Sequence, residues 1–159
     1  MDDEQKKAIK LLTIAYAHQR EGEFELAFEW YTRSIETFPT AEAYTFRGWT
    51  SSFQNKYEEA IEDCKKAIEV DPTFGNPYND IGAYLIELGR LEEGIPWLEK
   101  ATKAERYEPR HFPHYNLSRI YTRTFAYDKA IHHLKKTVEF EPNHEEAWRE
   151  LRRLSAALN

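Results

Sequence analysis

The sequence predicts an all-α protein built from tandem helix pairs. A four-residue pattern that closes on a small residue occurs four times, ending at Ala27, Ala60, Gly94 and Ala130, with spacings of 33, 34 and 36 residues. A period of this length is typical of helix-pair solenoids. Apolar residues follow helical spacing throughout, and turn signals such as Gly89 separate the helical segments. We therefore expect successive pairs to stack along one axis.

Each repeat also has small residues at three fixed positions. Two helices that cross at close range need short side chains at the contact, because bulky ridges hold the axes apart. The small residues therefore predict the helix crossings. They are Ala15, Gly48, Gly82 and Ser118; Ala27, Ala60, Gly94 and Ala130; and Ser34, Ala67, Ala101 and Thr137.

Helix boundaries are signalled at regular places. Pro39, Pro72 and Pro142 fall twelve residues after a closing alanine, where a proline ends one helix and precedes the next. Glu58-Glu59 and Glu92-Glu93 begin predicted second helices, where negative charge suits the helix dipole. These acidic pairs therefore need no catalytic explanation.

The pattern resembles the tetratricopeptide repeat family, whose consensus is W-x2-L-G-x2-Y, then A-x3-F, a small residue and P. The resemblance covers nearly all of a single domain, 1–159, and implies repeats at about 8–40, 41–74, 75–110 and 111–144. A further helix, at 145–157, begins like a fifth repeat and resembles the capping helix that closes such arrays. The predicted fold is an all-α, right-handed superhelical solenoid of four helix pairs plus a C-terminal capping helix.

Four features depart from the family pattern. Arg47 stands where the family has an apolar residue, and His114 replaces an aromatic one. Pro96 lies inside a predicted second helix, where it removes a backbone donor. We expect that helix to start late or to kink. The link 102–110 is longer than its counterparts, so extra helix or a loop is expected there.

Composition excludes several classes of function. The chain has 22 Lys+Arg against 28 Asp+Glu, a net charge of −6, and no run of basic residues that would compete for nucleic acid. No segment is apolar enough to span a membrane, and the acidic N-terminus does not resemble a secretory signal. A single cysteine, Cys64, suits a reducing compartment. We expect a cytoplasmic protein without membrane insertion.

Motifs for catalysis and metal binding are absent or weak. The sequence has no P-loop, G-x-S-x-G, H-E-x-x-H or G-x-G-x-x-G motif. His111 and His114 share the spacing of two ligands on one helical face, but no carboxylate is placed with them. The sequence therefore predicts a non-catalytic protein with no cofactor and no metal.

The resemblance implies that first helices line a concave groove that binds a partner. The groove residues carried over, with close neighbours, are Tyr16, Trp49, Phe53, Asn76, Asn79, Tyr115, Arg119, Arg123, Arg149 and Arg153. The N-terminal half is aromatic and the C-terminal half carries arginines, which recognise carboxylates in two-point fashion. We expect a protein or peptide partner with an acidic or C-terminal segment and an apolar anchor.

One branch of the family binds acidic chaperone tails through a Lys, Asn, Asn, Lys, Arg clamp. This chain lacks that clamp, which disfavours chaperone-tail binding. At the corresponding places stand Leu12, Tyr16, Phe46, Asn76 and Asp80 in one register, and Thr45, Trp49, Asp80, Phe112 and Asn116 in the next.

Other interpretations remain open at this point. Tyr16, Trp49 and Phe53 could simply pack between helices, and the arginines could pair with Glu145, Glu146 and Glu150. The main rival function is self-association as a homo-oligomer through surplus aromatic residues such as Trp30, Trp97 or Phe140. A third is a docking or regulatory subunit of an enzyme complex.

Overall fold

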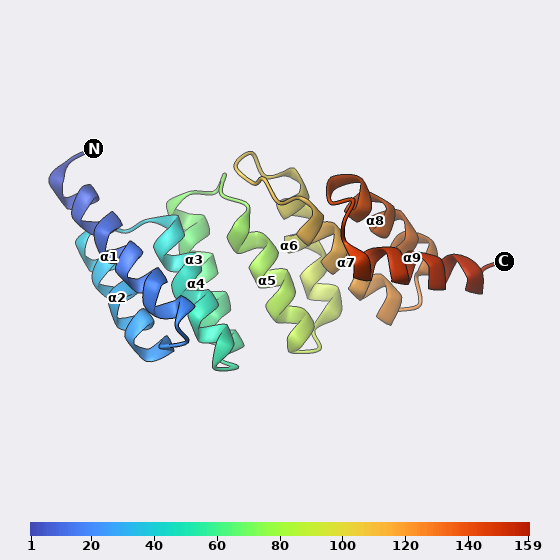
Figure 1. Ribbon diagram of the computed structural model, residues 1–159, viewed down its shortest axis with the longest axis horizontal. Helices are drawn as coiled ribbons and strands as arrows, with labels where there is room; N and C mark the ends of the chain where they lie inside the picture. The colour runs from blue at the N-terminus through green and yellow to red at the C-terminus, as the bar shows by residue number, and fades with distance from the viewer.

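A computed structural model describes all residues, 1–159, and contains nine α-helices (Figure 1). Together with the absence of strands, this confirms the predicted all-α solenoid. The helices are α1 (Asp3–Arg20), α2 (Phe24–Thr37), α3 (Ala41–Phe53), α4 (Tyr57–Val70), α5 (Asn76–Glu87), α6 (Leu91–Lys103), α7 (His111–Arg123), α8 (Tyr127–Phe140) and α9 (Glu145–Ala157).

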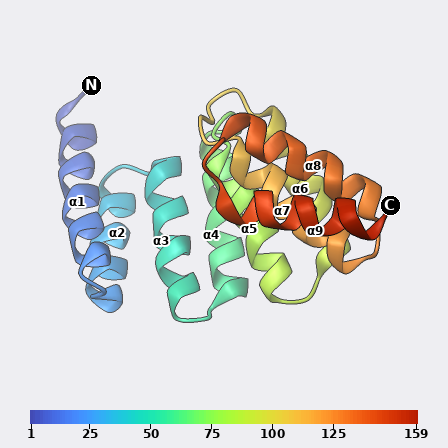
Figure 2. The same cartoon turned by 45° about the vertical axis from the view of Figure 1, so that its right-hand side comes forward.

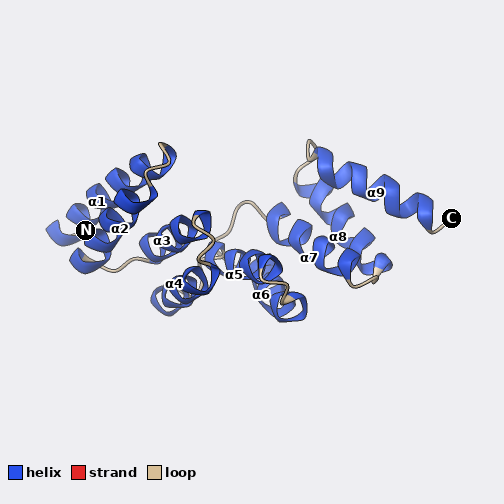
Figure 3. Cartoon of the chain, turned by 90° about the horizontal axis from the view of Figure 1, so that it is seen from below, coloured by secondary structure: helices blue, strands red, loops and turns tan.

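The helices stack as successive pairs that follow an arc (Figure 3). Each of the helices α1, α3, α5 and α7 packs on the even-numbered helix that follows it. The odd-numbered helices α1, α3, α5 and α7 also contact one another in sequence, whereas no contact of similar extent joins the even-numbered ones. The odd-numbered helices therefore form the inner, concave layer and the even-numbered helices the outer layer.

All twelve small residues predicted at the crossings are buried. Gly82 shows why they are small, because a Cβ atom added there would overlap the side chain of Leu98 on α6. At Gly48, an added Cβ would lie 2.9 Å from the backbone oxygen of Ala60 on α4. The close approach of paired helices thus depends on the missing side chains.

Arg47 is accommodated by an ion pair with another helix. Its guanidinium group donates from Nε and Nη2 to the two carboxylate oxygens of Asp63, at 2.8 and 2.7 Å. Nη1 also donates to Thr32, at 3.2 Å. The aliphatic stem can pack where the family has an apolar residue, while Asp63 neutralises the charge.

The second helix of repeat three, which contains Pro96, was expected to start late or to kink. The alternative of a late start is wrong, because α6 begins at Leu91 and continues through Pro96. Pro96 has no N–H to donate to the carbonyl of Glu92, and the helix continues without this bond.

The long link after α6 is a loop rather than extra helix. Arg106 donates its backbone N–H to Thr73 and accepts from Gly75, at 3.0 and 3.1 Å. The ring of Tyr107 fills the space left by the missing side chain of Gly75. These contacts tie the loop to the chain segment that precedes α5.

The last helix, α9, packs mainly on α8 (Figure 2). Ala147 and Leu154 from α9 join Ala130 and Leu134 from α8 in one apolar cluster. No second helix follows to complete the pair. The structure also contains no helix that is both long and apolar enough to cross a membrane.

Candidate functional site

The N-terminal half of the concave face carries a cluster of partly exposed aromatic rings. Trp49 and Phe53, one turn apart on α3, are 38% and 50% exposed. The ring of Phe53 stacks on Phe24 of α2, with centroids 4.8 Å apart, and Trp49 lies 5.3 Å from Phe53. Tyr16 of α1 is also exposed and lies against Phe46. Two of the three predicted aromatic residues, Trp49 and Phe53, therefore lie together, whereas Tyr16 contacts a different ring, and all three remain accessible.

The rings of Phe24, Trp49 and Phe53 border a cavity of about 330 Å³, the aromatic cavity. Its remaining lining comes from the end of α1 and the turn after it, which includes Gly22 in a left-handed conformation. Gln19 is buried in this wall, and its Oε1 accepts a hydrogen bond of 2.6 Å from the hydroxyl of Tyr31. The lining residues are Gln19, Arg20, Gly22, Phe24, Trp49 and Phe53.

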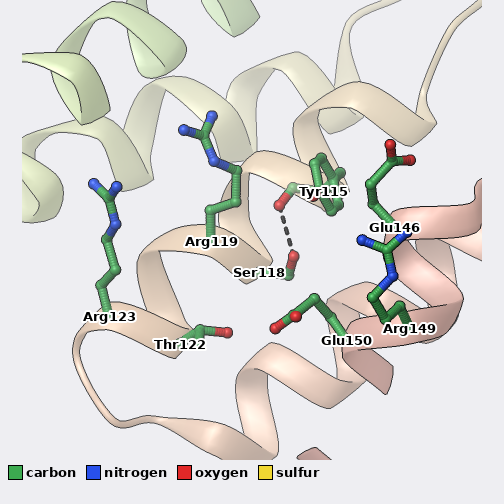
Figure 4. A pocket seen from close by; sticks show the side chains of 8 residues that line it. All are labelled: Tyr115, Ser118, Arg119, Thr122, Arg123, Glu146, Arg149 and Glu150. Atoms are coloured by element: carbon green, nitrogen blue, oxygen red, sulfur yellow. Dashed lines mark hydrogen bonds between the residues drawn. The ribbon is translucent and has the colours of Figure 1, made fainter. Parts of the chain in front are cut away.

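The C-terminal half contains a second cavity, of about 250 Å³, the arginine cavity. It lies between α7 and α9, where α9 packs on α8 and leaves the concave side of α7 open. Figure 4 shows Arg119 and Arg123 extending in the same direction from α7, with Arg149 projecting from α9. The lining residues are Tyr115, Ser118, Arg119, Thr122, Arg123, Glu146, Arg149 and Glu150.

The arginines differ in their ion pairs. Arg119 donates to Glu87 at 3.3 Å and to the side chain of Asn116 at 3.1 Å. Arg123 and Arg149 form no ion pair. Two guanidinium groups at the arginine cavity therefore have no carboxylate partner within the chain.

Arg153 lies apart from this cavity. It pairs with Glu150 one turn earlier on α9, where Nη2 donates at 2.6 Å. The pair is exposed on one helix, so it contributes little to stability. Of the four predicted arginines, the structure therefore brings three to the same cavity.

The two predicted asparagines of α5 differ in their surroundings. Asn79 is only 8% exposed, and its Oδ1 accepts a hydrogen bond of 3.0 Å from Asn116 on α7. This bond ties α5 to α7 through the acceptor atom of Asn79, and a role of Asn79 in partner binding stays a prediction. Asn76, at the first position of α5, is partly exposed.

Sequence reasoning missed the pairing of two histidines. His114 on α7 faces His133 on α8, with the Nδ1 atoms 3.0 Å apart, and stacks on Phe140. Burial lowers the pKa of each imidazole to about 4. His111, the other member of the predicted pair, instead contacts His144, which caps α9. No signal within one helix could have linked His114 to a residue nineteen positions away.

Comparisons with known proteins identify the family. Models of the tetratricopeptide repeat match residues 41–74, 76–107 and 113–144. The chain belongs to the tetratricopeptide repeat family. Members of this family are generally non-catalytic protein-interaction modules, and the curvature and accessible inner face described above agree with that role.

Curated relatives resemble only part of this chain. It is 45% identical to "Protein SGT1 homolog" of Oryza sativa subsp. japonica over 46% of its length, and 43% identical to "Sperm-associated antigen 1" of Mus musculus over 53%. The matched segments span only 19% and 9% of those two proteins.

Solved structures share the tetratricopeptide architecture over more of the chain. PilF of Pseudomonas aeruginosa superimposes with a TM-score of 0.90, covering 96% of this chain and 69% of that one at 19% identity. The second tetratricopeptide domain of Spaghetti (RPAP3), bound to the HSP90 peptide SRMEEVD, superimposes with a TM-score of 0.60 at 29% identity. That match covers 64% of this chain and 94% of that one.

Proposed function

We propose that this tetratricopeptide array is a scaffold that binds an acidic segment of a partner protein in its concave groove. The observation that carries the proposal is the arginine cavity, in which Arg123 and Arg149 have no carboxylate partner. A guanidinium fork matches a carboxylate through two parallel hydrogen bonds. An acidic side chain or a C-terminal carboxylate would therefore supply the missing counter-charge.

The charged residues that line the arginine cavity favour the binding of a carboxylate. Three arginines line the cavity against two glutamates, and one of these, Glu150, is already paired with Arg153. Glu146 lies 3.6 Å from His144. A bound anion would thus meet an excess of positive charge close to its binding position.

The aromatic cavity supplies an apolar anchor for the same segment. Trp49 and Phe53 present rigid ring surface, which gives contact area at a small entropy cost. An apolar side chain of the partner would bury this exposed surface. The two cavities together favour a segment long enough to cross several first helices.

A tetratricopeptide domain bound to the acidic peptide SRMEEVD gives a precedent for anion binding on this fold. The proposal for this chain depends on different residues. Where the family clamp has Lys and Arg, this chain has Leu12 and Asp80 in one register, and Thr45 and Asn116 in the next. The acidic partner proposed here is therefore not a chaperone tail held by that clamp.

Affinity capture from native lysate with mass spectrometry tests the proposal. The Arg119→Glu/Arg123→Glu variant should keep its helical circular dichroism and lose the partner, because two attractive charges become repulsive. The matched control, Lys135→Glu/Arg152→Glu, makes the same charge change at exposed positions outside the cavity and should keep the partner. Equal recovery of the partner by all three proteins would exclude the arginine cavity.

Self-association is the second candidate, favoured by apolar exposure away from the groove. Phe125 is 77% exposed in the α7–α8 turn, where its backbone has a φ of 61°. Phe140 and Trp148 are also exposed. Light scattering at several concentrations, comparing wild type with Phe125→Ser, would reveal a homo-oligomer that depends on this ring. A cytoplasmic location stays a prediction from the sequence.

A further inference from the structure

The first helix pair carries exposed apolar side chains at one end of the array. Helices α1 and α2 lie at that end, and their main contacts with the later helices are to α3 (Figure 1). Ile14 of α1 and Leu26 of α2 are 39% and 42% exposed, and Trp30 of α2 is half-buried. We call the surface formed by these three residues the end face.

Ile14 has a counterpart in each later repeat, and the preceding outer helix covers every counterpart. Spacings of 33, 34 and 36 residues place the counterparts at Arg47, Ile81 and Leu117. The guanidinium group of Arg47 lies over Phe28 of α2, 5.1 Å from the ring centroid. Ile81 and Leu117 are fully buried in clusters with residues of α4 and α6. At the position of the end face, the later repeats therefore each bind a helix, whereas Ile14 is exposed.

Repeat three shows how the pair of Ile14 and Trp30 can be covered, because it contains the same pair as Ile81 and Trp97. In both repeats a basic side chain three residues after the tryptophan lies over its ring, at 4.6 and 5.1 Å from the centroid. Ile81 shares a buried cluster with apolar side chains of α4, and Trp97 packs against that cluster. One face of α4 therefore covers in repeat three the pair that is accessible in repeat one.

The outer helices that cover a following helix share one pattern. Residues at positions i, i+3 and i+7 lie on the same face of a helix, and in α4 these residues join or contact the cluster around Ile81. All but one of the corresponding residues are apolar. They are Phe28, Tyr31 and Ile35 in α2; Ile61, Cys64 and Ile68 in α4; Ile95, Leu98 and Thr102 in α6; and Ile131, Leu134 and Val138 in α8. A helix that covers the end face should therefore present apolar residues at these three positions.

The border of the end face is basic. Lys10 takes the position that Ala43, Pro77 and Pro113 occupy in the later repeats. Those three residues are buried, whereas Lys10 is exposed. Arg33 of α2 is also exposed, and neither Lys10 nor Arg33 forms an ion pair. Carboxylates beside the apolar face of a covering helix would supply the counter-charges.

We propose that the end face binds an amphipathic helix of a partner protein, with apolar residues at i, i+3 and i+7 and acidic residues beside them. This helix would lie on α1 as α4 lies on α5. Every outer helix of this chain already packs on the helix that follows it, so the partner is a different protein rather than a second copy. Ile14 and the groove residue Tyr16 point to opposite sides of α1, because they are two residues apart on a helix. The end face is therefore separate from the groove.

Selection from a random library of stapled helices, each as long as α4, tests the proposal. The staple is needed because an isolated helix of this length is marginal in water. Helices are retained when they bind the intact protein but not Ile14→Glu, which places a charge on the end face. We expect the retained helices to carry apolar residues at i, i+3 and i+7, with Asp or Glu beside them.

The affinity of one retained helix is then measured with further variants. Leu26→Glu should bind about tenfold or more weakly than wild type, because the added charge would lose hydration against the apolar side of the helix. The matched control Ile9→Glu makes the same change as Ile14→Glu at an exposed position on the groove side of α1 and should bind like wild type. Arg33→Glu should prefer a form of the helix in which lysines replace the acidic residues.

The proposal would be overturned by retained helices that lack the pattern, by equal losses in Ile9→Glu and Leu26→Glu, or by the absence of any helix that depends on the end face. A dimer detected by light scattering in wild type but not in Ile14→Glu would also overturn it, since a second copy would then cover this face. The groove is tested apart from it, because Arg119→Glu/Arg123→Glu should bind the retained helix like wild type. If Ile14→Glu loses helical circular dichroism, Leu26→Glu replaces it in the selection, and the same pattern is still required.

Discussion

Arg47 and Asp63 form a nearly buried, two-point ion pair between α3 and α4, with side chains 13% and 8% exposed. Both hydrogen bonds are short, and the guanidinium group also lies over the ring of Phe28. Such a pair need not be more stabilising than a well-packed apolar contact, because both charges lose hydration. Removing only one partner of the pair is more destabilising, because the other buried charge then has no counter-charge.

Replacing Asp63 should therefore be strongly destabilising. We expect Asp63→Ala to lower the free energy of unfolding by about 3–5 kcal/mol, because the Arg47 guanidinium loses its counter-charge. Urea denaturation followed by circular dichroism measures the change. The control Glu62→Ala removes an exposed carboxylate that pairs with Lys65 and should change stability by less than about 1 kcal/mol. Equal effects of the two substitutions would show that the Arg47 pair is not needed.

The Arg47 position illustrates how far the sequence alone can be interpreted. The repeat register shows that an arginine occupies an apolar place, but its partner is sixteen residues away on another helix. Repeat spacing fixes which helix faces are buried, because that depends on small residues at a regular period. It does not fix side-chain partners across helices, because they depend on rotamers and on the exact crossing geometry.

Gly82 gives a direct test of the close helix crossing. The Gly82→Ala substitution should destabilise the protein by about 1–3 kcal/mol, even though alanine favours helix, because the added Cβ would overlap Leu98. Thermal unfolding measures the effect. In the Leu98→Ala background the same substitution should cost less, since the space it needs has been vacated. Additive costs in the double variant would place the strain elsewhere.

Tyr31 and Gln19 form a buried polar contact that should stabilise the first repeat. Both side chains are buried, and Tyr31 donates to Gln19 at 2.6 Å. Tyr31→Phe should lower the free energy of unfolding by about 1–3 kcal/mol, because the buried carboxamide loses its hydrogen-bond donor. Chemical denaturation tests this value. Tyr44→Phe serves as the control, since its hydroxyl forms no hydrogen bond, and an equally large loss there would contradict the explanation.

The candidate site was predictable in part for the same reason as the fold. Residues such as Trp49 and Arg123 occupy groove positions set by the repeat, and the structure places them at cavities. Asn79 occupies such a position too, but a hydrogen bond from Asn116 turns it into an inter-helix contact. Whether a groove position is free for a partner depends on the neighbouring repeat, and one repeat pattern does not contain that information.

The paired histidines, His114 and His133, should make the protein less stable in acid. Each has a pKa of about 4 in the folded state, against about 6.5 for an unperturbed histidine. Between these values the unfolded chain binds protons that the folded chain does not, so unfolding becomes easier as the pH falls from 6.5 to 4. The contact between the Nδ1 atoms adds to this effect, because two protonated rings would both be donors at 3.0 Å.

Asp80 changes the pH dependence of stability in the opposite direction, so its effect must be separated from that of the histidines. Its folded pKa of about 7 exceeds the usual value of about 3.9, so the folded chain keeps a proton that the unfolded chain has lost. Its contribution to stability therefore rises as the pH falls through that range. The histidine effect must be measured as a difference between wild type and a variant that differs only at the histidines.

Thermal midpoints of wild type and His114→Phe/His133→Phe, measured from pH 7 to pH 5, make this comparison. Phenylalanine keeps the stacking with Phe140 and Tyr121 and removes both titrating rings. The midpoint of wild type should fall more steeply with acid than that of the variant. His132→Phe, at an exposed position on α8, should keep the steep wild-type dependence. Parallel curves for wild type and the double variant would show that the pair does not control acid stability. The remaining loss of stability in acid would then belong to other groups such as His111, whose pKa is also lowered by burial.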